Sequence, residues 1–388
     1  MNVMIFINVF HHVVYNILKM QYIYLYPTCV TVKGYSRSIL QDLQQMKYFF
    51  IPNFLEETLQ KTTGKTVMEL REAIGNDELY NEYITFLTEQ NVVYFSENKI
   101  DFSMLPLEYS YPAKISNGII ICSAKVIDNF KHIIESLTFL GCEHLQVYYT
   151  TCESKKSITS LLAFFEDTRI RSIELIINNI TGFESIESVK AFFAKYHRLF
   201  KLIISGASHT QKVFVDPFNQ KHIFYSQNQI SYNDCGCIHP LFFKNNLSFY
   251  VEGLSFNTCL NRKVCVDANG DIKNCPSVSQ NFGNIFKNSL EEIIDNDEFK
   301  KYWKINKNNI DICRDCEFRY MCPDCRVFLK KDYTNSQPLK CTYNPYVCKW
   351  QGEDGYVPVD ECGEYNDFEE FSTVGEKILQ LNKQIWGE

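Results

Sequence analysis

Closely spaced cysteines are the residues of this sequence best suited to chemistry. The chain holds sixteen cysteines, and half of them fall between Cys259 and Cys341. A two-residue gap between cysteines lets a loop fold back so that both sulfurs reach one metal centre. Such gaps occur twice in the run CRDCEFRYMCPDC, which holds Cys313, Cys316, Cys322 and Cys325. The spacing therefore predicts metal binding by thiolates.

Further cysteines flank this run on both sides. Upstream, the segment VDANGDIKNC places Gly270 at the turn of a predicted hairpin and Cys275 on its return strand. The candidate metal ligands are Cys259, Cys265, Cys275, Cys313, Cys316, Cys322, Cys325, Cys341 and Cys348. Zinc and iron–sulfur clusters both take four thiolates, so the spacing alone leaves both metals open.

Other motifs are weaker. The Asp-Cys-Gly-Cys run at residues 234–237 either supplies more thiolates or forms a turn. The sequence has no Gly-rich phosphate loop and no nucleophile elbow, so no catalytic residue is predicted.

Charge and length restrict the classes of function. The formal charge is −7 over 388 residues, which argues against a nucleic-acid-binding protein. The first twenty residues are apolar but lack a basic start and a cleavage site. Their uninterrupted apolar run is too short to cross a bilayer. We therefore expect a cytoplasmic protein without a membrane partner, in which residues 1–20 are an uncertain extension and the native start lies near Met20.

The helices and strands that must position these cysteines are expected in several segments along the chain. Residues 21–112 show a strand in YIYLYPTCV, helical patterns in SRSILQDLQQM, ETLQKTTGKTVMELREAIG and NDELYNEYITFLTEQ, and a closing hairpin in NVVYFSENKIDF. This order predicts a small winged-helix domain with Asn76 and Asp77 at a helix start. Its helix positions Ile39, Leu43 and Met46 are a candidate pocket for a peptide.

Residues 113–235 alternate strand and helix patterns, from the strand GIIICSA to the strand KHIFYSQ. This predicts an α/β domain on a largely parallel sheet, an open sheet or partial barrel with too few units for eight-fold closure. Residues 236–350 form the cysteine-rich segment. Residues 351–388 are predicted to be an acidic C-terminal tail that ends in a helix.

The order of cysteines resembles that of the SPASM domain of radical S-adenosylmethionine peptide-modifying enzymes. Cys259, Gly270 and Cys275 stand as cysteine, ten residues, glycine, four residues, cysteine, and the later cysteines complete the order. The resemblance implies two auxiliary [4Fe–4S] clusters. It assigns Cys259, Cys265, Cys275 and Cys325 to the first cluster and Cys313, Cys316, Cys322 and Cys341 to the second. The chain departs from the family in having only Pro323 and Asp324 before Cys325, and Cys348 competes with Cys341 as the last ligand.

A longer resemblance involves VKGYSRSILQDL, YFFIPNFL and NTCLNRKVCVDANGDIKNCPS. These segments look like those of the SPASM peptide maturase of grasp-with-spasm systems. The resemblance implies a role in ribosomal peptide biosynthesis, with a small precursor peptide and an ATP-grasp ligase as partners. It also implies that residues 21–112 recognise the leader of the precursor as an added strand.

One motif of the radical enzymes is missing. Their catalytic cluster needs three thiolates at gaps of three and two residues, and this sequence has no such motif. Cys122, which follows the corresponding strand, stands alone and is predicted to be a buried apolar residue. We therefore expect a radical-SAM-like domain that has degenerated, and no cleavage of S-adenosylmethionine. The hypotheses are a peptide maturase component with two clusters, a zinc-binding and catalytically inert adaptor that recognises the peptide, or an enzyme whose active site the sequence does not reveal.

Overall fold

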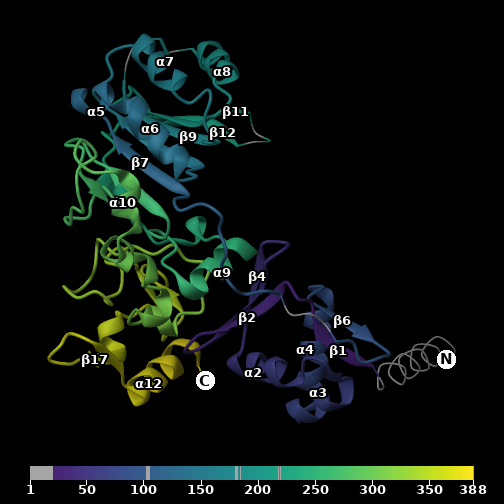
Figure 1. Ribbon diagram of the computed structural model, residues 1–388. Helices are drawn as coiled ribbons and strands as arrows, with labels where there is room; N and C mark the ends of the chain where they lie inside the picture. Colours follow the sequence, from purple (N-terminus) through teal and green to yellow (C-terminus); the bar gives the residue numbers. More distant parts are fainter. Residues whose placement is uncertain are drawn as a thin grey trace.

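The computed structural model describes residues 21–387, apart from 102–104, 180–181, 184, 217 and 219. Figure 1 shows a large sheet with its helices at one end, a turn-rich C-terminal region below it and an N-terminal region that projects to the side. The predicted extension at residues 1–20 lies outside the described residues. Among the described helices, none has the length and apolar character needed to span a membrane.

The N-terminal region contains two three-stranded antiparallel sheets, with orders β5-β1-β6 and β2-β3-β4. Three helices share one core with both sheets, which includes Leu40, Leu55, Leu70 and Leu87. Asn76 caps the third helix, as predicted. The elements are β1 (Tyr22–Leu25), β2 (Cys29–Lys33), β3 (Ser38–Asp42), β4 (Lys47–Ile51), α2 (Asn53–Thr62), β5 (Lys65–Thr66), α3 (Val67–Ile74), α4 (Asp77–Glu89) and β6 (Val93–Ser96).

The helix predicted in SRSILQDLQQM is wrong, because Ser38–Asp42 is the central strand β3. The candidate peptide pocket fails with it. Ile39 and Leu43 are buried against the C-terminal region, and Met46 lies in the turn after β3 with 67% of its surface exposed. The predicted closing hairpin is also absent, because β6 pairs with β1 and residues 97–101 form no strand. The winged-helix arrangement stays a prediction.

The central feature is one eight-stranded sheet of order β11-β12-β10-β9-β8-β7-β13-β14. Its six inner strands are parallel, and β11 and β14 are antiparallel edges. This confirms the predicted α/β class with a large, mostly parallel and open sheet. The strands are β7 (Asn117–Ile121), β8 (His144–Tyr149), β9 (Ser172–Asn178), β10 (Leu199–Ser205), β11 (Gln211–Asp216), β12 (Lys221–Ser226), β13 (Lys263–Val266) and β14 (Ile272–Lys273).

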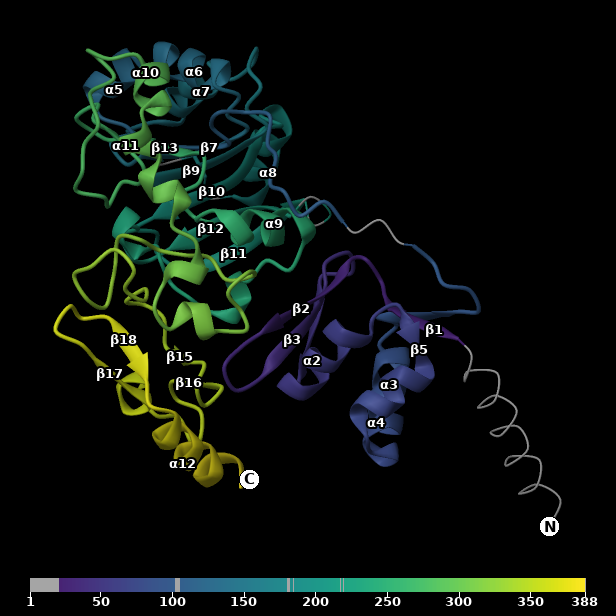
Figure 2. The ribbon, with the colours of Figure 1, turned by 60° about the horizontal axis from the view of Figure 1, so that its bottom comes forward.

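Helices cover one face of this sheet, where Figure 2 shows α5, α6, α7 and α10 side by side. That face carries the largest core, which includes Ile120, Phe130, Ile158 and Phe192. A smaller cluster around Tyr148 covers the other face. The helices are α5 (Ala124–Asp128), α6 (Phe130–Phe139), α7 (Lys155–Ala163), α8 (Ile186–Lys195) and, from the cysteine-rich segment, α10 (Leu290–Asp295) and α11 (Asp297–Lys300).

The C-terminal region consists mainly of turns around short elements. The hairpin predicted around Gly270 is present as β13 and β14, and Gly270 has a φ of 83°, where a side chain would be strained. Because β13 pairs with β7, the sheet continues past residue 235. The remaining elements are α9 (Leu247–Ser255), the 3-10 helices η1 (Tyr232–Asp234), η2 (Pro240–Phe242), η3 (Lys301–Lys304), η4 (Lys307–Asn309), η5 (Cys313–Asp315) and η6 (Val359–Cys362), β15 (Tyr343–Asn344), β16 (Lys349–Trp350), β17 (Gly363–Tyr365), β18 (Phe371–Thr373) and α12 (Gly375–Trp386).

The sheet β2-β3-β4 packs directly on the cysteine-rich region. Val32, Ile39 and Leu43 share a core with Phe318 and Met321. The contact is also polar, since Tyr35 donates its backbone N–H to the carbonyl of Asp315 at 2.8 Å. The N-terminal region is therefore fixed against the segment that carries the closest cysteine spacing.

Candidate metal centre

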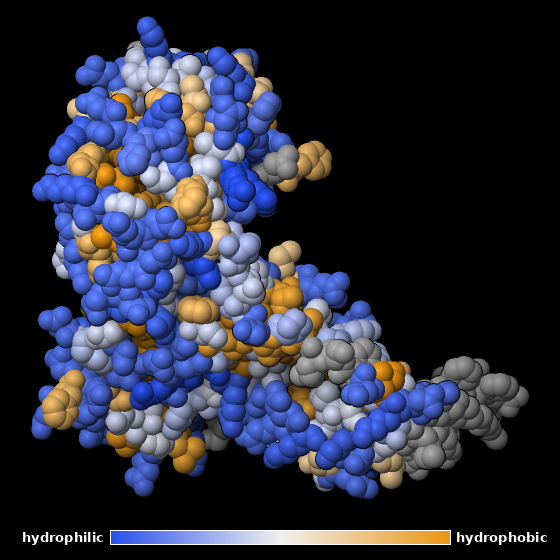
Figure 3. Space-filling view, in the orientation of Figure 1, coloured by the Kyte–Doolittle hydropathy of each residue, from blue (hydrophilic) through white to orange (hydrophobic). Residues whose placement is uncertain are grey.

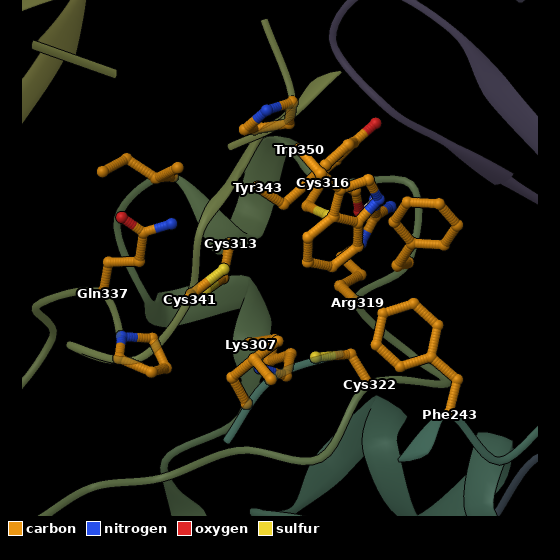
Figure 4. A pocket seen from close by; sticks show the side chains of 15 residues that line it. Phe243, Lys307, Cys313, Cys316, Arg319, Cys322, Gln337, Cys341, Tyr343 and Trp350 are labelled. Carbon is orange, nitrogen blue, oxygen red and sulfur yellow. Dashed lines mark hydrogen bonds between the residues drawn. The ribbon is translucent and has the colours of Figure 1, made fainter. Parts of the chain in front are cut away.

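Four of the candidate ligands surround a single cavity. Figure 4 shows the side chains of Cys313, Cys316, Cys322 and Cys341 around the same space, and all four line this cavity. η5 begins at Cys313 and ends just before Cys316, so this short helix sets the spacing of the first pair. These four residues are the set that the resemblance assigned to the second cluster.

The cavity is buried and mostly apolar, with a positive charge at one side. Burial raises the pKa of Cys313 to about 11 and that of Cys322 to about 12, while Lys307 opposes the shift in both. Lys307 is only 4% exposed. The free thiols of Cys313 and Cys322 are therefore protonated at neutral pH, and a metal must displace their protons. Soft thiol donors with apolar walls and one buried cation fit an iron–sulfur cluster by their chemistry.

A buried polar network holds the short gap between Cys322 and Cys325. Asp324, which is 2% exposed, is 2.8 Å from Arg326 and 3.5 Å from Lys307. It also accepts a hydrogen bond from Asn257 Nδ2 at 2.6 Å. The gap that departs from the family pattern is thus fixed by three partners.

Cys348 does not line the cavity. It is buried beside Tyr343 and Glu317, and burial raises its pKa to about 12. Glu317 accepts hydrogen bonds from the Tyr343 hydroxyl at 2.5 Å and from Arg37 Nε at 2.7 Å. The geometry therefore groups Cys341 with the cavity and Cys348 with this ionic cluster.

The cysteines that the resemblance assigned to the first cluster do not all lie together. Cys259 and Cys275 meet around Lys263, whose Nζ donates to Cys259 Sγ at 3.4 Å. Cys325 lies close enough to Cys259 for the two thiols to interact. Cys265 lies within β13 and is fully buried, with Asp267, Lys273 and Lys263 as its charged neighbours. Cys275 was predicted on the return strand of the hairpin, but it lies two residues after the end of β14.

A cysteine outside the predicted set joins this group. The Cys235 thiol interacts with the Cys275 thiol, and this interaction together with Lys340 and Lys263 lowers the pKa of Cys235 to about 6. The same interaction raises the pKa of Cys275. In the sequence, only the Asp-Cys-Gly-Cys run indicated Cys235 as a candidate ligand. The spacing of this run could not show whether its cysteines bind metal or simply form a turn.

Cys122 lies in the main core, 3% exposed, as predicted for an apolar residue. Cys142 and Cys152 are buried in the same core. Within the described part of the chain, no three His, Cys, Asp or Glu side chains are close enough together to hold one metal ion.

Comparison with known families identifies the cysteine-rich region. Residues 258–317 match the model of the SPASM family, described as an iron–sulfur cluster-binding domain. The match includes Cys259, Cys265, Cys275, Cys313 and Cys316 and ends before Cys322. The C-terminal region therefore carries a SPASM domain, as predicted, and domains of this type bind iron–sulfur clusters.

No curated protein matches the chain. Among solved structures, that of Streptococcus suis SuiB bound to S-adenosylmethionine is similar, with 12% identity over 81% of this chain and 98% of that chain and a TM-score of 0.37. The structure of Streptococcus suis SuiB bound to precursor peptide SuiA has the same identity and coverage and a TM-score of 0.35.

Proposed function

We propose that this protein carries two [4Fe–4S] clusters and takes part in maturing a ribosomally made precursor peptide. The observation that carries the proposal is the cavity lined by Cys313, Cys316, Cys322 and Cys341, next to a segment that matches an iron–sulfur domain. In this proposal these four residues hold the second cluster. Such clusters supply electron transfer when bound, and the buried Lys307 would stabilise the negative charge of the second cluster.

The metal is tested by analysing the chain after anaerobic purification. Two clusters correspond to about eight iron and eight acid-labile sulfide ions per chain. The competing function is a zinc-binding, catalytically inert adaptor, whose protein would be colourless and contain zinc without sulfide. That result would replace the cluster proposal by the adaptor.

The second part of the proposal concerns the peptide. The family resemblance implies that residues 21–112 recognise the precursor and that an ATP-grasp ligase acts with this protein in the cytoplasm. The strand β4 supports this proposal because it is an edge strand, which pairs only with β3 in its sheet. An unpaired strand edge offers N–H and C=O groups to an added strand.

The surface next to this edge is apolar. Phe50 on β4 is 48% exposed and Met46 before it is 67% exposed, and Figure 3 shows apolar side chains gathered over β4. A peptide strand along β4 can hydrogen-bond to the edge and pack its alternate side chains against these residues.

Binding is tested with the full chain, because residues 21–112 alone would expose Val32, Ile39 and Leu43. Labelled leader of a precursor encoded beside the gene should bind saturably, with a dissociation constant in the micromolar range because a disordered peptide must become ordered. Phe50→Asp should weaken this binding at least about tenfold, while Phe139→Asp, at an exposed residue of α6, should not. Absence of saturable binding by the folded chain would restrict residues 21–112 to a structural role.

A further inference from the structure

The loop before η2 lies over the first group of cysteines. η1 (Tyr232–Asp234) opens with a capping box between Ser231 and Asp234 and leads directly into Cys235. The Cys235 thiol then lies close enough to the Cys275 thiol for the two to interact. Cys235 is itself exposed, so the loop forms the outer wall of this group.

The same loop passes close to a second cysteine of the group. Gly236 has a φ of 84°, and a β-carbon added there would stand 3.1 Å from Cys325 Sγ and 3.3 Å from the Phe328 ring. Only a glycine lets the backbone approach this sulfur so closely. Cys235 and Cys325 also interact with each other. The loop therefore contacts two of the candidate ligands at successive residues.

Contacts from other segments fix the loop in this position. Lys340 Nζ donates to the carbonyl of Asn233 at 3.0 Å and to that of Cys235 at 2.6 Å. Ser277, two residues after Cys275, donates its hydroxyl to Asn233 Oδ1 at 2.9 Å. These contacts, at Asn233 and at the carbonyl of Cys235 itself, fix the position of Cys235 next to Cys275.

The charge at this place suits several thiolates. Lys263 is buried among Cys259, Cys275 and Cys235 and keeps its positive charge there. Four thiolates around one cluster carry a net negative charge, and a buried cation reduces the cost of placing it in the interior. Lys263 is also a charged neighbour of Cys265, but there the carboxylate of Asp267 has the largest charge effect and disfavours the thiolate.

We propose that Cys235 is the fourth thiolate ligand of the first cluster, together with Cys259, Cys275 and Cys325, in the place that family resemblance gives to Cys265. This inference rests on the proposed function, because it requires a cluster at the site. The ligand then comes from the segment that joins the large sheet to the SPASM domain, and binding of the cluster ties that segment down.

Alkylation of the full, iron-loaded chain tests the inference, with Cys237 as an internal control. Cys237 is also exposed and lies two residues away. With iodoacetamide under anaerobic conditions and a phosphine reductant present, mass spectrometry should show Cys235 labelled at least tenfold more slowly than Cys237. Removal of iron by a chelator should abolish the difference. The reductant ensures that protection does not come from a disulfide between Cys235 and Cys275.

Variants give an independent measurement. Cys235→Ala should lower the iron content by up to about four ions per chain or change the electron paramagnetic resonance signal of one cluster. Cys237→Ala should match the wild type in both, and Cys265→Ala should keep its iron. Because Cys235 is exposed, its truncation leaves the core intact.

Three outcomes separate the possibilities. Equal labelling of Cys235 and Cys237 in iron-loaded protein overturns the inference. A normal signal in Cys235→Ala combined with loss of iron in Cys265→Ala also overturns it and restores Cys265 as the ligand. A wild-type chain without iron and sulfide refutes the proposed function itself, which the labelling pattern alone would not do.

Discussion

Asn257 connects the two groups of cysteines at the scale of single residues. Its Oδ1 accepts the backbone N–H of Cys259 at 3.0 Å, and its Nδ2 donates to Asp324 Oδ2 at 2.6 Å. Asp324 stands between Cys322 of one group and Cys325 of the other. Two residues are therefore enough to separate a ligand of one group from a ligand of the other. The carboxylate of Asp324 in this gap is held by Asn257, which also binds the backbone of Cys259 in the first group.

Replacing Asp324 by Ala should strongly destabilise the C-terminal region. Lys307 and Arg326 would keep buried positive charges without their partner, which costs about 3–5 kcal/mol. Chemical denaturation of the metal-loaded chain measures this change. Asp332→Ala, at an exposed position of the same region, should leave stability close to that of the wild type. Equal stability of the two variants would contradict a structural role for Asp324.

Replacing Cys313 and Cys316 together by Ala should remove the metal of the second group. The variant should lose about four iron ions per chain and become more sensitive to protease between residues 300 and 350, because small cysteine-rich folds gain much of their stability from metal. Cys142→Ala serves as the control, since Cys142 is buried in the sheet core far from this cavity in the fold. Unchanged iron and unchanged proteolysis in the double variant would refute the assignment.

The sequence could predict those ligands whose positions follow from local spacing, but not those whose positions depend on the packing of distant segments. Gaps of two and five residues within one loop fix Cys313, Cys316 and Cys322 locally, so spacing sufficed for them. The choice between Cys341 and Cys348, and the approach of Cys235 to Cys275, depend on how distant segments pack. No pattern along the chain carries that packing.

At the scale of elements, β3 shows why periodicity misled. Ile39 and Leu43 pack on the C-terminal region, while Leu40 packs on the N-terminal core. All five residues of the strand are buried, so the alternation of a half-buried strand is lost. The apolar positions that remain are spaced as in a helix. By contrast, the helices of the large sheet each have one buried face, which is why the α/β class of residues 113–235 could be predicted from the sequence.

Arg37 links β2-β3-β4 to the cysteine-rich region, and its removal should loosen this contact. Arg37→Ala would leave the carboxylate of Glu317, with a side chain only 1% exposed, without its charged partner and held only by neutral groups such as the Tyr343 hydroxyl. The expected cost is about 2–3 kcal/mol. It should appear as a lower Tm and as faster proteolysis between β2 and β3.

The exposed ion pair between Arg71 and Asp77 in the same region offers the comparison. Arg71→Ala should change Tm much less, because exposed pairs are screened by water and salt. If both variants had the same effect, the Arg37 contact would not hold the two regions together.

At the scale of the whole molecule, the SPASM region and the large sheet form one continuous structure. β13 adds to β7 in parallel, so the SPASM segment begins inside the sheet. On its other side the region receives β2-β3-β4. If a peptide binds along β4 as proposed, it would therefore lie beside the second group of cysteines. The cysteine-rich region lies between the N-terminal region and the large sheet.

The last prediction concerns the α/β domain, which should not cleave S-adenosylmethionine. β7 ends at Ile121 and α5 begins at Ala124, so only two residues join them. Ser123 caps α5 by accepting the backbone N–H of Val126 and donates to the carbonyl of Ala268 at 2.7 Å, which fixes the connection.

A loop this short cannot present three thiolates to one cluster, and the Cys122 thiol next to it is buried in the core. The anaerobically reduced, iron-loaded protein should therefore form no 5′-deoxyadenosine above a control without protein, with or without precursor peptide. Chromatography with mass detection measures the product, and a known radical enzyme in the same reductant verifies the assay. Sustained formation of 5′-deoxyadenosine would show that the chain, despite this short connection, builds a catalytic cluster from other cysteines.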